Sequence, residues 1–521
     1  MIVHCTDPLA GACQRFVQGM SMNNAESRRS RLLVVSNRLP VVVKRDAGGQ
    51  WQVSRGSGGL VTALLPVLRG RGGTWVGWLG TSEPIHPFDD VIQQASAESG
   101  CRLSPVALSE EERKRFYHGF ANEILWPLFH DLQSHCIFDP SYWQAYQTVN
   151  RRYAEVACAQ AEDSDFVWVH DYHLMTVGAE LRRLGTRARL GFFLHIPFPP
   201  LDIYVKLPWR LTLLRALLDY DLVGFQTLRD RRNFVDCVRN LLRDVRVFGR
   251  GQVITARVGE RDVRIGSFPI GIDFNAFMRG AAAREVGERV NALRALLPGR
   301  KLILGVDRLD YTKGIPQRLE AFRSALARFP DLHERVTLVQ VVVPSREEIP
   351  QYEELRTRIE QRVGEINGQF TRPGGWVPIH YVFRHLDPVD LLAYYRLAEI
   401  ALVTPLKDGM NLVAKEYCAC SVEENCVLVL SEFAGASAQL QDGALLVNPY
   451  DTEGMAEALH RAFTMDHGER RARMRQLRRA VRAQDVFWWV NSFLRAAIAR
   501  DLSNFPLPPD YVPQGEATTV V

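Results

Sequence analysis

The stretch EIALVTPLKDGMNLVAKE, residues 399–416, contains a complete strand–turn–helix unit. Ile400–Val403 is an apolar run of strand length, Asp408 is a candidate N-cap for the following helix, and Gly409 would let a ligand approach the backbone closely. The N-terminus of a helix carries unpaired N–H groups and partial positive charge, which suit a phosphate. Glu416 follows Asp408 by about two helical turns. The segment is therefore either half of a sugar-nucleotide site, with two carboxylates for hydroxyl groups, or an ordinary strand–helix joint with solvated carboxylates.

Similar apolar runs recur along the chain, and helical patterns lie between many of them. They are residues 31–36, 166–169, 190–194, 222–225, 263–268, 301–306, 336–343, 380–383, 427–430 and 444–447. Continuous apolar runs are typical of parallel strands buried on both faces, and strands that alternate with helices indicate an α/β protein. The turn at 269–273 is the expected boundary between two Rossmann-like domains, 31–270 and 271–495, with the ligand site in the cleft at the strand ends. We expect a loose extension over 1–30 and a disordered tail over 505–521.

Length and composition limit the class of protein. A chain of 521 residues with 46% hydrophobic and 24% charged residues is expected to form two large globular domains. A net charge of +5 is small for this length, so nucleic acid is not an expected partner. Nine cysteines without a Cys-x-x-Cys pair argue against a disulfide framework or structural zinc and fit the cytoplasm. Neither a membrane span nor a signal peptide is evident, so no membrane partner is expected.

Several charged residues follow the expected strands directly. Arg38 follows the first strand, and a glycine pair, Gly58 and Gly59, comes soon after it. Arg308 and Lys313 follow the strand at 301–306, and Arg346 follows the strand at 336–343. Such cations could hold phosphate groups and neutralise a diphosphate leaving group. The alternatives are a surface turn for the glycine pair and a solvated helix start for the two cations.

The segment His170-Asp171-Tyr172-His173 is rich in groups that could bind a metal or serve in hydrogen bonding. No fourth metal ligand is evident. His195 ends the next strand, and a lone histidine at such a place has either a structural or a catalytic role. Because two neighbouring strand ends bring acidic and imidazole groups into one cleft, a functional role is favoured. The Asp-x-Asp pattern at 163–165 precedes its strand, so we expect a solvated loop at the wrong edge of the sheet.

Longer motifs carry a family resemblance. They are VSNR at 35–38, GGL at 58–60, WVGW at 75–78, NEILWPLF at 122–129, WVHDYHL at 168–174, 191–199, DLVGFQT at 221–227, 307–314, 405–416 and SEFAGA at 431–436. On these motifs, which cover nearly everything from 31 to about 495, the chain resembles the trehalose-6-phosphate synthases. These are retaining glycosyltransferases of the GT-B fold, with two Rossmann-like domains facing a central cleft, and in this fold the last helix packs back on the first domain.

The resemblance implies transfer of glucose from a nucleotide-glucose, UDP-glucose foremost, to glucose 6-phosphate, giving α,α-trehalose 6-phosphate. The implied donor-binding residues are Gly58, Gly59, Arg308, Lys313, Leu386, Asp408, Leu412, Val413, Ala414, Lys415 and Glu416. The implied acceptor-binding residues are Arg38, Tyr117, Asp171 and Arg346, and Trp126 and His195 match positions that govern anomeric selectivity. The catalytic set would be Arg308, Lys313, Asp171, His195 and Asp408. The resemblance also implies that no metal or other cofactor is needed, that the enzyme is a dimer or tetramer, and that a separate trehalose-phosphate phosphatase acts downstream.

Three alternatives stay open at this point. The acceptor could be glycerol 3-phosphate, as in glucosylglycerol-phosphate synthases, or a cyclitol. The chain could also be a regulatory homologue without catalysis, although the intact Arg308, Lys313, Asp408 and Glu416 set argues against this. Sequence does not separate UDP from GDP or ADP donors, and the pair Trp488–Trp489 could belong to a core or to an interface.

Overall fold

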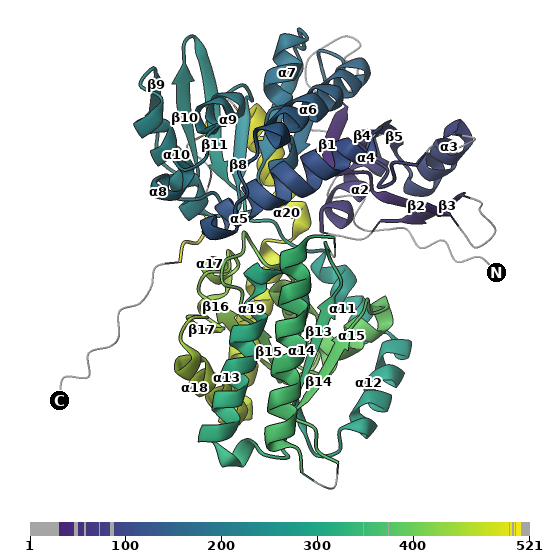
Figure 1. Ribbon diagram of the computed structural model, residues 1–521, viewed down its shortest axis with the longest axis vertical. Coiled ribbons are helices and arrows are strands. Elements are labelled where there is room, and N and C mark those ends of the chain that lie inside the picture. Colours follow the sequence, from purple (N-terminus) through teal and green to yellow (C-terminus); the bar gives the residue numbers. More distant parts are fainter. Residues whose placement is uncertain are drawn as a thin grey trace, which may run out of the picture.

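The computed structural model describes residues 31–45, 51–56, 59–71, 73–83, 88–346, 348–372, 375–499, 501–502, 505 and 507–511. The expected extension over 1–30, and Gly58 of the glycine pair, lie outside these residues. The chain forms two lobes, one built around each of two large sheets (Figure 1). None of the described helices has both the length and the apolar character that a bilayer span needs. All the described cysteines are free thiols.

The first lobe contains a nine-stranded sheet in the order β5-β4-β1-β6-β7-β8-β11-β10-β9, and β10 alone runs antiparallel to its neighbours. Its strands are β1 (Leu32–Arg38), β4 (Thr74–Trp78), β5 (Arg102–Val106), β6 (Phe166–His170), β7 (Arg189–Phe193), β8 (Leu222–Phe225), β9 (Val245–Phe248), β10 (Val253–Val258) and β11 (Arg261–Ser267). A separate hairpin joins β2 (Val41–Arg45) and β3 (Trp51–Arg55). The central strands β6 and β8 are buried along their whole length, as the apolar runs predict.

Helices surround this sheet. They are α2 (Gly59–Arg71), α3 (Phe88–Ser99), α4 (Glu110–Glu112), the π-helix η1 (Arg113–Leu125), α5 (Trp126–Phe129), η2 (Gln133–His135), α6 (Pro140–Gln160), η3 (Tyr172–Leu174), α7 (Val177–Arg183), α8 (Leu201–Tyr204), α9 (Arg210–Leu217) and α10 (Leu228–Leu241). The π-helical stretch carries Tyr117, whose ring stacks on that of His173 just after β6, and it leads directly into α5. Short π-helical stretches are frequent at functional sites.

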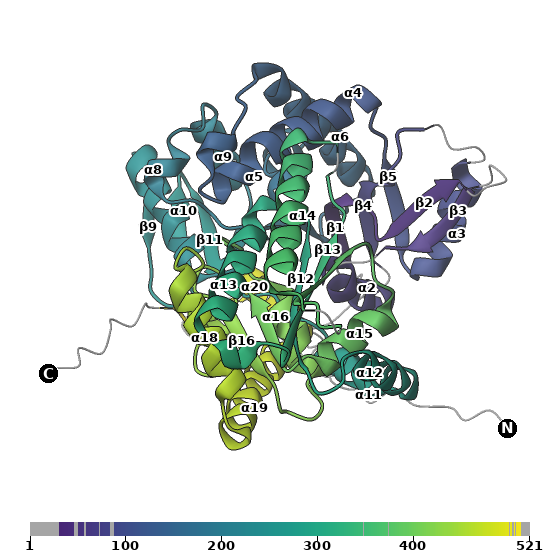
Figure 2. The same cartoon turned by 60° about the horizontal axis from the view of Figure 1, so that its bottom comes forward.

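The second lobe contains a six-stranded, fully parallel sheet in the order β14-β13-β12-β15-β16-β17. Its strands are β12 (Lys301–Arg308), β13 (Val336–Val343), β14 (Ile379–Phe383), β15 (Ile400–Val403), β16 (Val427–Ser431) and β17 (Leu445–Val447). Its helices are α11 (Phe274–Ala282), α12 (Arg284–Leu296), η4 (Tyr311–Lys313), α13 (Ile315–Arg328), η5 (Pro330–Leu332), α14 (Pro350–Phe370), α15 (Pro388–Leu397), α16 (Leu412–Cys420), α17 (Ser437–Leu440), α18 (Thr452–Thr464) and α19 (His467–Ala483). The helices α13 and α14 lie in front of this sheet in Figures 1 and 2. One fully parallel and one largely parallel sheet, with helices around them, confirm the predicted α/β class.

The C-terminal helix α20 (Val486–Ile498) returns to the first lobe (Figure 1). Trp489 is fully buried, with its ring centroid 5.0 Å from that of Trp168. Phe493 stacks on the same tryptophan at 4.4 Å. Trp489 is therefore a core residue, which resolves one of the alternatives left open for the tryptophan pair, and Trp488 is partly buried against the same core.

The expected disorder from residue 505 onward does not hold for the described part of that segment. Phe505 packs into the core, and the guanidinium of Arg495 lies 5.6 Å from its ring centroid. Asp510 pairs with Arg232, and the Tyr511 hydroxyl donates to Glu432 at 2.7 Å. A composition rich in proline and polar residues did not reveal these long-range contacts.

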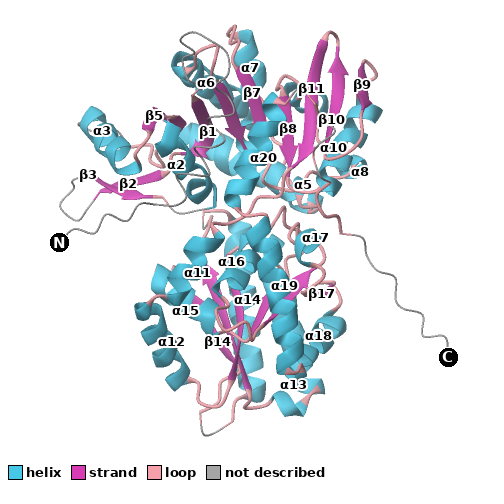
Figure 3. Ribbon diagram, turned by 180° about the vertical axis from the view of Figure 1, so that it is seen from behind, coloured by secondary structure: helices cyan, strands magenta, loops and turns pink. Residues whose placement is uncertain are grey.

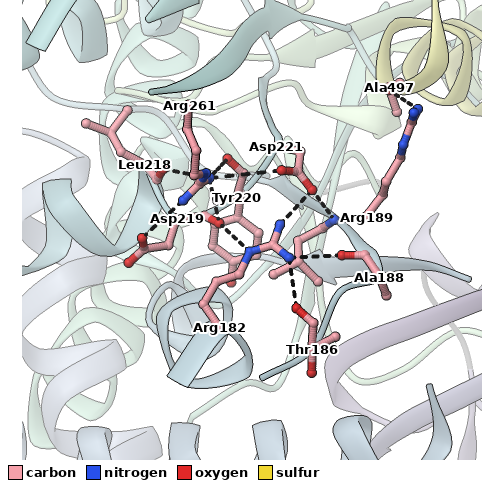
Figure 4. A network of polar contacts seen from close by, with 11 residues as sticks. Arg182, Thr186, Ala188, Arg189, Leu218, Asp219, Tyr220, Asp221, Arg261 and Ala497 are labelled. Carbon is pink, nitrogen blue, oxygen red and sulfur yellow. Dashed lines mark hydrogen bonds and ion pairs between the residues drawn. The ribbon is translucent and has the colours of Figure 1, made fainter. Parts of the chain in front are cut away.

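Polar networks hold the amino edge of the first sheet, opposite the cleft (Figure 4). Arg182 donates to Asp221 at 2.7 Å and also to the backbone carbonyls of Thr186, Ala188 and Asp219. Arg261 donates to the backbone carbonyls of Leu218, Asp219 and Tyr220. At the same edge, Asp165 is buried and accepts from Arg31 at 3.0 Å, so the expectation of a solvated loop is wrong for this residue.

Candidate active site

The start of α16 lies where the second lobe faces the first. Asn411, not Asp408, is the N-cap: its side chain accepts from the backbone N–H of Ala414 at 3.1 Å, and its φ is 78°. The expectation that Asp408 caps this helix is therefore wrong, because Asp408 lies three positions before the cap. Early N–H groups of a helix have no intrahelical acceptor, so those of Leu412 and Val413 are left for an anion, whereas that of Ala414 is already used.

Asp408 instead pairs with Lys313. The Nζ of Lys313, at the end of η4, lies 2.7 Å from Oδ2 of Asp408, and both side chains are largely buried. Asn411 also donates to this oxygen at 3.2 Å. Burial acts to raise the pKa of Asp408, but the Lys313 ammonium outweighs it and holds the pKa below its usual value. The site thus combines a fixed carboxylate with a fixed cation next to the helix start.

Gly409 serves a different purpose from the one expected. A Cβ at this position would lie 2.3 Å from the backbone oxygen of His195, so the missing side chain lets the first lobe, rather than a ligand, approach. Ion pairs also join the lobes, among them Lys407 with Asp131 and Arg113 with Glu348. The loop before α16 is therefore the place where the two halves of the site meet.

Arg346 forms the centre of a second cationic region. Its guanidinium donates to the Tyr352 hydroxyl at 2.6 Å and to the Tyr172 hydroxyl, in the other lobe, at 3.3 Å, and it lies 3.5 Å from Asp310. It also lies over the Trp126 ring, 4.1 Å from the centroid. These contacts hold the side chain rigidly, although it comes from a residue with φ of 52°.

Three guanidinium groups converge on Tyr117. Burial acts to raise the pKa of its hydroxyl, but Arg346, Arg38 and Arg308 together lower it below the usual value. Tyr117 stacks on His173 at 5.7 Å, and Arg308 lies 5.9 Å from the Trp126 ring centroid. Arg38 lines a cavity of about 600 Å³. The structure therefore brings together the residues matched to acceptor binding.

Asp171 is oriented by the backbone. Its Oδ1 accepts from the N–H groups of Tyr172 at 3.0 Å and His195 at 3.2 Å, and its own φ is 75°. Burial raises the pKa of this carboxyl to about 6, against the opposing effect of these hydrogen bonds. Asp171, Arg346 and Asn411 are three of the described non-glycine residues with positive φ, and backbone strain of this kind clusters at functional sites.

Both ring nitrogens of His195 are engaged within the protein. Gln226 accepts from the backbone N–H of Ile270 at 2.9 Å through its Oε1, so its Nε2 donates to His195 Nδ1 at 3.4 Å. His195 then carries its proton on Nε2 and donates to His170 Nδ1 at 3.2 Å. Burial lowers the pKa of His195 to about 3, so the ring is neutral.

The possible metal ligands at 170–173 do not converge. His170 faces His195, Asp171 faces backbone N–H groups, and His173 lies between the rings of Tyr117 and Tyr172. Over the described ranges, no group of three His, Cys, Asp or Glu side chains is arranged to hold a metal ion.

The remaining donor-site residues occupy three places. Glu416 lies on α16, accepts from the Tyr395 hydroxyl at 3.0 Å, and has its pKa raised to about 6 by burial. Gly59 begins α2, and the half-buried Leu386 lies in the loop after β14. The Nζ of Lys415 donates to the backbone carbonyl of Ile270.

Sequence reasoning missed several residues that build this site. Asn411, Gln226, Tyr172 and Asp310 position the expected groups but have no distinctive spacing of their own. Of these four residues, only Asn411 could have been found from the local sequence, because asparagine is a favoured N-cap residue. Arg318, which bonds the buried Asp307 at 2.5 Å, was also not expected.

The chain is similar to curated proteins over most of its length. The chain is 44% identical over 486 residues to the trehalose-6-phosphate synthase of Mycobacterium avium (strain 104), covering 92% of this chain and 97% of the relative. It is 43% identical to the trehalose-6-phosphate synthase of Mycobacterium tuberculosis (strain CDC 1551 / Oshkosh), covering 90% of this chain and 94% of the relative.

Solved structures are similar over the same range. An α,α-trehalose-phosphate synthase (UDP-forming) from Burkholderia xenovorans in complex with glucose-6-phosphate superposes with a TM-score of 0.80 at 36% identity, covering 90% of this chain and 100% of that chain. A trehalose-6-phosphate protein from E. coli bound with UDP-2-fluoro glucose gives a TM-score of 0.80 at 36% identity, covering 90% and 99%. The fold is thus GT-B, as the resemblance implies. Because the sequence profile of glycosyltransferase family 20 also matches residues 30–499, the chain belongs to glycosyltransferase family 20.

Proposed function

We propose that the protein transfers glucose from UDP-glucose to glucose 6-phosphate with retention, forming α,α-trehalose 6-phosphate and UDP. One observation carries the proposal: two cationic regions meet at a single indole. The guanidinium of Arg346, within the Tyr117 group, lies 4.1 Å from the Trp126 ring centroid, and that of Arg308 lies 5.9 Å from it. Arg308 ends β12, and the same connection leads to Lys313, whose ammonium pairs with Asp408 before the start of α16. A site for two phosphorylated substrates needs two such regions, one for a diphosphate and one for a phosphate monoester.

On the donor side, Leu412 and Val413 offer backbone N–H groups to a phosphate, and Arg308 and Lys313 offer positive charge to the departing diphosphate. Asp408 is ionised and accepts from hydroxyls of the transferred glucose, while Glu416 accepts from the ribose. Fixed cations of this kind stabilise an oxocarbenium-like transition state by drawing charge into the leaving group.

On the acceptor side, Arg38, Tyr117 and Arg346 bind the phosphate of glucose 6-phosphate, and Asp171 orients the sugar. The hydrogen bonds to His195 favour a mechanism without an imidazole acid or base, since both ring nitrogens have protein partners. The leaving phosphate then accepts the proton of the acceptor hydroxyl on the same face of the sugar, and no enzyme nucleophile is required.

The reaction is proposed to need no metal, because the residues around the diphosphate region supply its positive charge themselves. We further propose a cytoplasmic homo-oligomer, a dimer or tetramer, whose product is dephosphorylated by a separate trehalose-phosphate phosphatase. Treatment with EDTA tests the first statement, and sedimentation of the purified chain tests the oligomeric state.

A product assay tests the function. The protein is incubated with UDP-, GDP- or ADP-glucose and with glucose 6-phosphate or glycerol 3-phosphate, and the products are identified by mass spectrometry and digestion with trehalase after dephosphorylation. Trehalose phosphate from UDP-glucose is the expected result. Its absence with every donor overturns the proposal, and a glucosylglycerol phosphate would instead establish the alternative acceptor.

A further inference from the structure

Lys415 is a buried lysine that pairs with no carboxylate among the residues that the structure describes. It lies on α16, one residue before Glu416, and only 1% of it is exposed. Burial alone lowers the pKa of its amine to about 7. Its Nζ donates to the backbone carbonyl of Ile270 at 2.6 Å and to the side-chain oxygen of Gln439. Burying an amine costs folding free energy, and hydrogen bonds such as the two that Lys415 donates offset part of that cost.

Ile270 belongs to the first connection between the lobes, after β11 and before α11. The same residue donates its N–H to Gln226 Oε1 at 2.9 Å, and Gln226 in turn donates to His195. A hydrogen-bonded chain therefore runs from the donor-site helix, through the connecting segment, to the end of β7 in the other lobe.

The second connection between the lobes reaches the same point. Gln439, on α17, donates through its amide to Gln484, just before α20. A Cβ on Gly271 would lie 2.4 Å from the Gln484 backbone oxygen, so the two connections are packed together. The backbone N–H of Val486 also donates to the carbonyl of Ile272 at 3.0 Å. Figure 3 shows α16 and α17 at the end of the second lobe that faces the first.

We propose that Lys415 is a positioning residue of the donor site: its amine ties the helix that carries Glu416 to both chain segments that connect the lobes. The orientation of α16 is then coupled to the relative position of the lobes, and the two halves of the site are brought into register through this side chain. The inference rests on the proposed function for the reaction concerned, but its geometry does not depend on that function.

The test compares Lys415→Met with Lys301→Met. Methionine keeps the shape of the stem and removes both donated hydrogen bonds. Lys301 is the matched control because it also donates to one backbone carbonyl, Phe463 at 2.9 Å, at the far edge of the same sheet, and burial likewise lowers the pKa of its amine. Steady-state kinetics are measured with each substrate varied in turn, and UDP binding is measured by calorimetry without the acceptor.

For Lys415→Met we expect kcat to fall and the KM for UDP-glucose and the Kd for UDP to rise, each about ten- to hundredfold, because two buried acceptors lose their donor. The KM for glucose 6-phosphate should stay within about twofold, and Lys301→Met should match the wild type in all of these values. Hydrogen exchange in peptides covering 268–273 should accelerate in the first variant only.

Lys415→Met kinetics equal to those of Lys301→Met would overturn the proposal, as would an equal loss for both substrates. If Lys415→Met does not fold, Gln439→Leu removes one of the same bonds without changing α16 and should give a smaller donor-specific loss. A normal donor KM in Gln439→Leu would then refute the role. Failure of the wild type to make trehalose phosphate concerns the proposed function alone, because UDP binding and hydrogen exchange test the lysine independently.

Discussion

Replacing Lys313 by methionine separates the role of the Lys313–Asp408 pair in catalysis from its role in stability. The ammonium lies 2.7 Å from Asp408, and both side chains are largely buried. Removing one partner of a buried ion pair costs about 3–5 kcal/mol in the free energy of unfolding, since the other charge is left uncompensated. Loss of one fixed donor to developing negative charge costs about 10²–10³ in kcat, or about 2.7–4 kcal/mol of transition-state stabilisation.

The double variant Lys313→Met/Asp408→Asn removes both charges and so restores most of the stability, and its asparagine can still interact with Asn411. It should not restore turnover, because the departing diphosphate still lacks its cation. The assay is UDP release under saturating substrates, with urea unfolding of each variant measured in parallel. Turnover of the single variant within about tenfold of wild type, or recovery of turnover in the double variant, would refute the assignment of Lys313 to the leaving group.

Three further outcomes are expected. Burial raises the pKa of Glu416 to about 6, so this carboxylate is ionised above that pH and is lost as a hydrogen-bond acceptor when the pH falls below it. The KM for UDP-glucose should therefore rise below pH 6. Glu416→Gln should have a KM for UDP-glucose about tenfold higher than the wild type, and this KM should no longer change with pH in that range. Arg346→Lys keeps the charge but loses the planar group that bridges Tyr172 and Tyr352, so the KM for glucose 6-phosphate should rise about tenfold or more while that for UDP-glucose changes little. Equal effects on both substrates would contradict this separation of the two phosphate regions. Trp489→Ala opens a cavity beneath α20 and should lower the free energy of unfolding by about 3–5 kcal/mol, measured by urea denaturation, whereas an unchanged unfolding midpoint would show that the helix is not part of the core.

Much of the fold could be predicted because parallel strands buried on both faces appear as continuous apolar runs. The predicted strands at 222–225, 336–343 and 400–403 have the same bounds in the structure. The predicted strand at 301–306 is longer in the structure, where β12 covers Lys301–Arg308. Element ends depend on caps and contacts that apolar patterning does not contain.

The candidate site was predictable to the extent that polar residues follow strand ends, and the carboxyl ends of parallel strands meet at one edge. This rule predicts the site residues Arg38, Asp171, Arg308 and Arg346, but it does not predict the hydrogen-bond or ion-pair partner of any of them. The expected N-cap failed because Asp408 is bound by Lys313, a residue 95 positions earlier in the chain.

The sequence by itself therefore determined the α/β class, the two largely parallel sheets and the family, since these follow from local patterning and from contiguous motifs. Only the tertiary structure decided which groups have free capacity for a substrate. His195 has its ring nitrogens occupied by His170 and Gln226, and Lys415 points to the connection between the lobes rather than to a phosphate. The physical reason is that hydrogen bonds and ion pairs depend on distances of a few ångströms between residues far apart in the chain, and only packing fixes those distances.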